Sequence, residues 1–428
     1  MTKSISSAAV PVTTAASEDD LLLRKVAWRI IPFLFVCYVV SFLDRINIGF
    51  AQLQMKHDLG FSDAMYGLGA AVFYIGYVLC EVPSNLLLAK YGARRTFTRI
   101  MLLWGLASVG MMFVSSPAHF YLLRFLLGVF EAGFFPGIVL YLTFWFPANR
   151  RAAVLSVFFA GVAVAGVFGG LVSGWIMRDM SGVMGLFGWQ WMFAIEGAPA
   201  VLLAVFALYY LVDSPRHAKW LTPLERDRLE TLCAEGRAKE SAHDSSALVA
   251  ALRNPRVYLF AFVYFSLTCA SLTLSFWMPL MIRDFGINDV VSVSLYSVVP
   301  NAIGAVGLVL IARHSDRAER EVLAALTLHP PSFPAMLAIL SVAAVLIFAA
   351  LPIFWSVPPG YLSGKTAAAG IAFISSIGIT SGIVSPWVIG QIRTTTGSMD
   401  LAVYLLAGLL LLSGLALMAG VKKESATA

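Results

Sequence analysis

Charged residues are scarce in this sequence. Only 13% of its 428 residues are Asp, Glu, Lys or Arg, whereas soluble proteins carry about 25%. Histidine and cysteine are also few, with six and four copies, and three of the cysteines fall within apolar runs. Such cysteines give no disulfide framework. These shortages argue against a soluble fold, redox chemistry and metal binding, and we expect no cofactor.

Long apolar runs are what the sequence has in abundance. Hydrophobic residues make up 59% of the chain, and a helix that crosses a bilayer needs about 20 mainly apolar residues. Six such runs precede a polar stretch and five follow it, at 26–50, 64–89, 97–114, 120–144, 152–177, 191–212, 257–282, 290–312, 335–354, 367–392 and 401–421. The pattern predicts an all-α polytopic membrane protein.

The polar segments divide the chain into parts. Residues 1–20 are rich in Ser, Thr and Ala without an apolar core, so we expect a disordered tail rather than a cleaved signal. A six-helix domain is predicted at 21–212, a cytoplasmic linker at 213–254 and a C-terminal helical domain at 255–428.

The formal net charge of +6 is explained by topology rather than by nucleic acid. Lys and Arg crowd the loops on one side, at 90, 94, 95, 99, 150, 151, 313, 317 and 320 and through 216–256. The opposite loops hold only Lys56, Arg178, Arg283 and Arg393. Since basic loops stay in the cytoplasm, we expect a multi-pass protein of the inner membrane with both termini cytoplasmic.

Four ionisable residues lie inside the predicted helices: Asp44, Arg45, Arg124 and Glu131. A charge at the centre of a membrane helix costs roughly 2.5–3.5 kcal/mol on the insertion scale, so such residues usually have a function. Two arginines beside two carboxylates indicate transport of an anion together with a proton. Arg124 and Glu131 are seven residues apart and share a helix face. A structural ion pair between them is the alternative.

These residues receive separate predicted roles. Arg45 and Arg124 would bind a carboxylate, whereas Asp44 and Glu131 would carry protons, since all six histidines lie in or beside loops. We also considered that ionised Asp44 pairs with Arg124. Polar and aromatic residues of the cavity-forming helices would set specificity, at Tyr38, Tyr77, Tyr264, Trp277, Asn301, Trp355, Ser375 and Ser376. For each of them, a buried side chain with a local hydrogen bond is an equal alternative.

Short motifs spread over nearly the whole chain carry a family resemblance. They are FLDRINIG at 42–49, EVPSN at 81–85, RFLLGVFEAGFFPG at 124–137, FWFP at 144–147, GWQWMF at 188–193 and DSP at 213–215. Together they resemble the anion:cation symporter family of the major facilitator superfamily, close to its tartrate, phthalate and hydroxyphenylacetate permeases. The resemblance implies import of a small organic carboxylate driven by protons or another cation.

Two loops resemble the superfamily's cytoplasmic signature, AKYGARR at 89–95 and HSDRAER at 314–320. The resemblance implies two six-helix domains built from repeats, with Asp316 and Arg317 latching the second. The first copy departs from the pattern, because Ala89 stands where an Asp would be. Glu81, in the EVPSN motif and near Lys90, is assigned either to gating or to helix packing.

The ninth helix of this fold is truncated in the sequence. Between Arg320 and the next apolar run stand only residues 321–333, which would span about 20 Å as a helix and include Pro330 and Pro331. Either about twenty residues of a normal span are missing or the helix is rebuilt from a stub. We favour missing residues, because an odd number of spans would place Lys422 and Lys423 outside.

The sequence therefore predicts a secondary active transporter, not an enzyme. We expect it to import a small organic carboxylate, a hydroxy acid such as tartrate or an aromatic acid, with protons by alternating access. An anion exchanger or exporter of the same fold is the alternative. Its partners would be the anion, protons and the lipid bilayer, with no nucleic acid, and the protein would act as a monomer.

Overall fold

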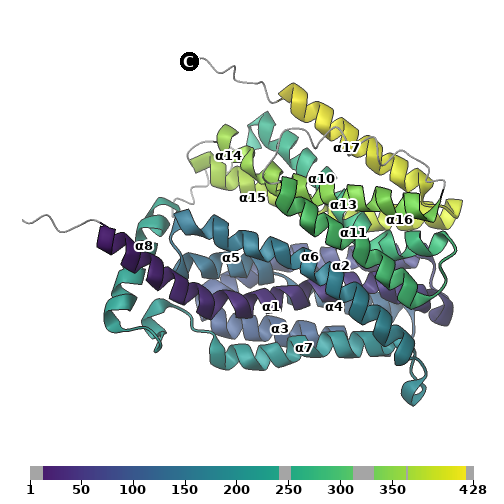
Figure 1. The fold of residues 1–428 in the computed structure, drawn as a ribbon, viewed down its shortest axis with the longest axis horizontal. Helices are drawn as coiled ribbons and strands as arrows, with labels where there is room; N and C mark the ends of the chain where they lie inside the picture. The colour runs from purple at the N-terminus through teal and green to yellow at the C-terminus, as the bar shows by residue number, and fades with distance from the viewer. Residues whose placement is uncertain (1–12, 241–251, 312–331, 363–364, 421–428) are drawn as a thin grey trace, which may run out of the picture.

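The computed structural model describes residues 13–240, 252–311, 332–362 and 365–420, and these form a helical protein of two stacked halves (Figure 1). The first half comprises α1 (Thr13–Leu59), α2 (Asp63–Tyr91), α3 (Ala93–Gly110), α4 (Pro117–Glu131), α5 (Phe134–Trp145), α6 (Ala148–Asp179) and α7 (Gly188–Tyr210). The second comprises α10 (Pro255–Asp284), α11 (Val290–Ile311), α13 (Phe333–Ser356), α14 (Pro358–Tyr361), α15 (Lys365–Ile379), α16 (Ser381–Thr396) and α17 (Asp400–Gly420). In these ranges, 11 helical segments are long and apolar enough to cross a membrane, which confirms the predicted class.

Helix α1 begins earlier than the predicted tail allows. Residues 13–20 are already helical, whereas residues 1–12 lie outside the described chain. In this stretch Asp20 pairs with Arg150 of α6, and Asp19 pairs with Arg228 in the segment that follows α7. These ion pairs attach the start of α1 to α6 and to that segment.

The predicted linker also contains a helix. Helix α8 (Pro223–Glu240) follows the first half and lies beside the start of α1 (Figure 1). Lys25 of α1 donates to Glu225 at 2.8 Å, and this ammonium holds the pKa of the Glu225 carboxyl below its ordinary value. The connecting segment is thereby attached to the first half rather than standing free between the halves.

Two predicted spans are interrupted. The run 120–144 divides into α4 and α5, because Ala132 has a ψ of 133° and Gly133 a φ of +82°, a left-handed conformation that favours glycine. Likewise, the run 367–392 divides into α15 and α16 at Thr380. The first interruption places Glu131 at the C-terminal end of α4, in the interior of the protein.

The two halves meet tightly at one end, where α1 and α10 end and α2 and α11 begin. There α2 crosses α16 at Gly67 and Gly390, and a Cβ on Gly390 would lie 2.6 Å from the carbonyl oxygen of Asp63. A Cβ on Gly170 of α6 would similarly lie 3.0 Å from the carbonyl oxygen of Ser294 on α11. Small residues allow such close approach of membrane helices. We call this region, which contains Asp63, Asp284 and Arg393, the closed end.

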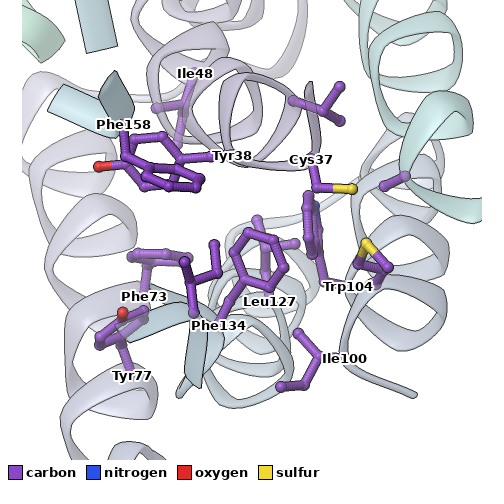
Figure 2. Close-up of a cluster of buried hydrophobic side chains, with 14 of the residues drawn as sticks. Cys37, Tyr38, Ile48, Phe73, Tyr77, Ile100, Trp104, Leu127, Phe134 and Phe158 are labelled. Carbon is purple, nitrogen blue, oxygen red and sulfur yellow. The ribbon is translucent and has the colours of Figure 1, made fainter. Parts of the chain in front are cut away.

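An aromatic cluster fills the interior of the first half (Figure 2). Tyr38 of α1 lies beside Phe158 of α6, with ring centroids 5.8 Å apart, and Phe73 lies beside Tyr77 on α2. Trp104 of α3 is fully buried nearby. The ionisable residues of α1 and α4 therefore lie in mostly apolar surroundings, where interactions between charges are strong.

The predicted truncated ninth helix falls between α11 and α13, and residues 312–331, with Asp316 and Arg317, lie outside the described chain. Phe333 at the start of α13 contacts Tyr296, in the half of α11 nearest the closed end. A largely apolar cavity of about 440 Å³ lies between α10, α13 and α17. The buried charges of the first half do not line this cavity.

Candidate functional site

Arg45 and Glu131 form an ion pair between α1 and α4. Arg45 Nε donates to Glu131 Oε1 at 2.6 Å, and the hydroxyl of Ser41, one turn earlier on α1, donates to the same oxygen at 2.7 Å. Glu131 is fully buried and the Arg45 side chain is 15% exposed. The Glu131 Oε2 atom has no hydrogen-bond partner among the described residues. Glu131 is therefore neutralised by Arg45, rather than by Arg124 on its own helix.

Arg124 is buried without such a counterion. The residue is 1% exposed, and its Nε donates to the carbonyl of Gly69 at 3.2 Å. Its guanidinium lies over the Phe73 ring, 4.8 Å from the centroid, where a cation–π contact stabilises it. In the described part of the chain, neither Nη1 nor Nη2 has a hydrogen-bond partner, and no carboxylate forms an ion pair with this side chain. Two buried donors of Arg124 are thus without an acceptor among the described residues.

Asp44 does not pair with Arg124, which corrects one interpretation of the sequence. Its carboxylate accepts hydrogen bonds from Trp104 Nε1 at 2.5 Å and from Ser108 Oγ at 2.6 Å, both on α3. A third, long bond of 3.5 Å comes from Asn47 on its own helix. The neighbours Asp44 and Arg45 therefore contact different helices, α3 and α4, because successive helix positions point in directions about 100° apart.

Aromatic residues of the first half surround Arg45. The guanidinium lies 5.0 Å from the ring centroid of Tyr77, and Tyr38 interacts electrostatically with Arg45 and with Tyr264 of α10. Tyr264 in turn contacts Trp355 of α13, with centroids 4.8 Å apart. Four of the predicted specificity residues are therefore close to the buried charges or to one another.

The other predicted specificity residues lie elsewhere. Trp277 is fully buried against Tyr66, and its Nε1 has no partner among the described residues. Asn301 donates to Ser297 of its own helix and lines a cavity of about 20 Å³ beside Gly166. On α15, Ser375 is half-buried, whereas Ser376 is exposed and donates to the carbonyl of Ala372. These four residues do not gather around Arg45.

Glu81 is half-buried on α2 and interacts electrostatically with Arg45. In the same motif, Ser84 packs against the break between α4 and α5, where a Cβ on Gly133 would lie 2.6 Å from the Ser84 side chain. The EVPSN and EAG motifs thus contact each other. For the described part of the chain, this supports a packing role at Ser84 and places Glu81 beside the charged cluster.

A second charged cluster lies at the closed end and was missed by sequence reasoning. Asp63 accepts from Gln52 at 3.0 Å, from Lys56 at 2.8 Å and from Arg393 of the second half at 3.2 Å. Arg393 also donates twice to Asp284, at 2.6 and 2.8 Å. The only signal in the sequence was a charged residue close to each helix end, which we had assigned to membrane topology alone.

Sequence reasoning also missed Ser41, Trp104 and Ser108, which hold the two predicted proton carriers. Ser41 lies four positions before Arg45, a spacing that places both on one helix face and was visible in the sequence. Trp104 and Ser108 share a face of α3 by the same spacing. Nothing in the sequence indicates that this face of α3 meets Asp44, because that contact depends on how the helices pack.

The chain is similar in sequence to known membrane transporters. The chain matches the family model described as Major Facilitator Superfamily over residues 34–420. It is 48% identical to a putative tartrate transporter of Agrobacterium vitis, over 92% of this chain and 90% of that protein, which supports the resemblance drawn from the motifs. It is also 39% identical to a quinolone resistance transporter of Acinetobacter baumannii, over 94% of each chain.

A solved structure shares the fold at low sequence identity. It is a bacterial homologue of the human lysosomal transporter Spinster in an inward-facing, unoccupied conformation, with a TM-score of 0.74 and 18% identity, covering 94% of this chain and 99% of that one. The family match over residues 34–420 agrees with the helical fold that the two structures share. The chain belongs to the Major Facilitator Superfamily and is a multi-pass membrane transporter.

Proposed function

We propose that the protein imports a small organic carboxylate together with protons. The observation that carries this proposal is Arg124, a buried arginine whose Nη1 and Nη2 lack acceptors among the described residues. A buried charge left unpaired is strongly unfavourable, so an anion that reaches Arg124 would be bound there. The planar guanidinium offers two parallel N–H groups, which suit a carboxylate. A hydroxy acid such as tartrate fits this chemistry, and an aromatic acid would also contact Tyr38 and Tyr77.

Proton coupling would follow from the Arg45–Glu131 pair. When a carboxylate approaches Arg45, it competes with Glu131 for the same guanidinium. A Glu131 that loses its counterion in an apolar interior is favoured in its protonated form. Binding of the anion would thus accompany uptake of a proton at Glu131, with Asp44 as the supporting carboxyl. Tyr38, Tyr77, Tyr264 and Trp355 would line the path of the substrate.

Alternating access would use the closed end as one gate. Asp63, Arg393 and Asp284 join the halves there, and opening would separate α2 from α16. We propose that this end faces away from the cytoplasm, because the basic residues concentrate at the opposite ends of the helices. Both termini and α8 would then lie on the cytoplasmic side of the inner membrane, and the monomer would be the working unit.

Export is the second candidate. The relative in Acinetobacter baumannii carries the name quinolone resistance transporter, and quinolones are carboxylates that a resistant cell must remove. The same arginines would bind such an anion from the cytoplasm, and protons entering in exchange would drive it out. Direction therefore distinguishes the two candidates more sharply than the binding residues do.

Purified protein in liposomes tests both candidates. Labelled tartrate is supplied outside, and a pH gradient is imposed in either direction, with protein-free liposomes as the control. Import with protons predicts accumulation above the outside concentration only when the outside is acidic. A quinolone that accumulates when the lumen is acidic would instead support export. No movement of any organic acid under either gradient would refute the proposed function.

A further inference from the structure

A third carboxyl lies in the core of the first half, behind α1. Glu196 of α7 is 5% exposed, and its Oε1 accepts a hydrogen bond from Ser173 Oγ of α6 at 2.7 Å. In the described chain no Lys or Arg forms an ion pair with this side chain. The adjacent Gly197 packs so closely on α3 that a Cβ there would lie 2.9 Å from the Ser108 side chain. Glu196 is therefore held in place, but without a counterion.

Two buried oxygen atoms near Glu196 lack donors. The Oε2 atom of Glu196 has no hydrogen-bond partner among the described residues, and neither has Oδ1 of Asn47. The Asn47 side chain lies within hydrogen-bonding reach of the Glu196 carboxyl. A buried carboxylate oxygen that has neither a donor nor a counterion is unfavourable in an apolar interior. A proton on Glu196 Oε2 would remove this uncompensated charge.

The hydrogen bonds distinguish Glu196 from Asp44. Asp44 accepts from three donors, Trp104, Ser108 and the Nδ2 group of Asn47, which is the environment of an ionised carboxylate. The Asn47 amide has two N–H groups, and its side chain also lies beside the Glu196 carboxyl. Asn47 thus lies between Asp44, which has three donors, and Glu196, which accepts from Ser173.

We propose that Glu196 holds a proton in this conformation and is a third proton carrier of transport, connected to Asp44 through Asn47. The inference rests on the proposed proton coupling. The charged groups that face Asp44 are Arg124 and Glu131 of α4, and the one that faces Glu196 is Asp44. When an anion neutralises Arg124, Asp44 loses the cation that favours its charge. A proton then leaves Glu196 Oε2 and binds a carboxylate oxygen of Asp44, so that Glu196 becomes ionised and Asp44 neutral.

Infrared spectroscopy of the purified protein tests the protonation directly, without a substrate. A protonated buried carboxyl shows a carbonyl stretching band distinct from that of a carboxylate. At neutral pH we expect one such band to disappear in Glu196→Gln, whose amide oxygen still accepts from Ser173. Glu230→Gln on the surface of α8 is the matched control and should leave the band unchanged. In Ser173→Ala the band should persist at a shifted frequency, because Oε1 loses its donor.

Transport by Glu196→Gln tests the coupling. We expect exchange of internal for external substrate to stay within about twofold of wild type, while accumulation driven by a pH gradient is lost. Identical infrared bands in wild type, Glu196→Gln and Ser173→Ala would overturn the proton assignment, whether or not tartrate is the substrate. Full pH-driven accumulation by Glu196→Gln would overturn its role in transport while leaving the proposed function intact.

Discussion

At the scale of single residues, Arg45 and Arg124 carry the same charge in different surroundings. Arg45 contacts Glu131 at 2.6 Å, whereas two terminal nitrogens of Arg124 have no partner in the described chain. Removing Arg45 would leave Glu131 without a counterion. Removing Arg124 would instead relieve a buried cation, so the protein retains it at a cost to stability. The proposed function accounts for this cost, because Arg124 would bind the transported anion.

The first prediction concerns Arg124→Lys. Lysine keeps the charge but loses the fork that offers two parallel hydrogen bonds to a carboxylate. Losing one bond to a charged group costs about 2 kcal/mol, so the Kd for the transported acid should rise roughly thirtyfold. Isothermal calorimetry on purified protein measures this, with the exposed Arg216→Lys as control. An unchanged Kd would show that the anion does not reach Arg124.

The second prediction concerns Glu131→Gln. The amide oxygen still accepts from Ser41 and Arg45, so the local geometry is retained, but the side chain cannot take up a proton. Accumulation driven by a pH gradient should disappear, while exchange between internal and external substrate survives, because exchange needs no net proton movement. Comparison of the two assays in the same liposomes is the measurement. Asp44→Asn should behave alike, and pH-driven accumulation in both variants would contradict the coupling role of this pair.

At the scale of elements, the break between α4 and α5 fixes the position of Glu131. The break requires a left-handed residue at Gly133, and Ser84 of α2 fills the space beside it. A continuous helix would carry residues 132–137 along a different path and would remove the contact of Gly133 with Ser84. The interruption therefore shapes the packing directly after Glu131.

The third prediction compares two glycine substitutions. Gly133→Ala places a Cβ at positive φ, which costs about 1 to 2 kcal/mol, and presses it against Ser84. The unfolding temperature in detergent should fall, and pH-driven transport should weaken. Gly414→Ala on α17 is the matched control, because nothing lies within 4 Å of its added Cβ, and it should not lower the unfolding temperature. Equal stability of both variants would mean that the break is not needed.

The helices themselves could be predicted from hydropathy, but their interruptions could not. Every predicted apolar run coincides with a described helix or pair of helices, because burial in lipid demands an unbroken apolar surface. The break at Ala132 and Gly133 could not be predicted in this way, because both residues are apolar like most of the run around them. The charge–charge contacts escaped prediction for a related reason. The spacing along one helix suggested an ion pair between Arg124 and Glu131. The partner of Glu131 is instead Arg45, because the packing of α1 against α4 brings that side chain to it.

At the scale of the whole molecule, side-chain bonds between the halves of the described chain gather at the closed end. Tyr66 donates to the carbonyl of Phe276, Arg283 donates to the carbonyl of Leu53, and Arg393 binds Asp63. Each half has its own packed helices, so the contacts between halves can open while those within each half remain. The sequence predicted two domains, but not which end joins them, because the joining residues look like ordinary charged residues at helix ends.

The fourth prediction locks this end. The backbone N–H of Ala64 donates to Thr394 Oγ1 at 2.8 Å, so these positions on α2 and α16 lie side by side. In a background without the four native cysteines, Ala64→Cys with Thr394→Cys should cross-link under oxidation and stop transport. A reductant should restore it, and each single substitution should transport with or without oxidant. Undiminished transport by fully cross-linked protein would show that this end need not open.

The arrangement of charges at the closed end has an electrical consequence. When the halves part, Asp63 keeps Lys56, and Asp284 keeps Arg393 with its two hydrogen bonds. The Asp63–Arg393 contact that breaks therefore leaves each of its partners in a neutral pair, while Arg283, which donates to Leu53 at the same end, stays with the second half as an additional charge. A membrane voltage does work of about 2.3 kcal/mol per elementary charge per 100 mV. The two neutral pairs contribute little to that work, so the voltage acts on Arg283 and on the protons and anion of the proposed transport.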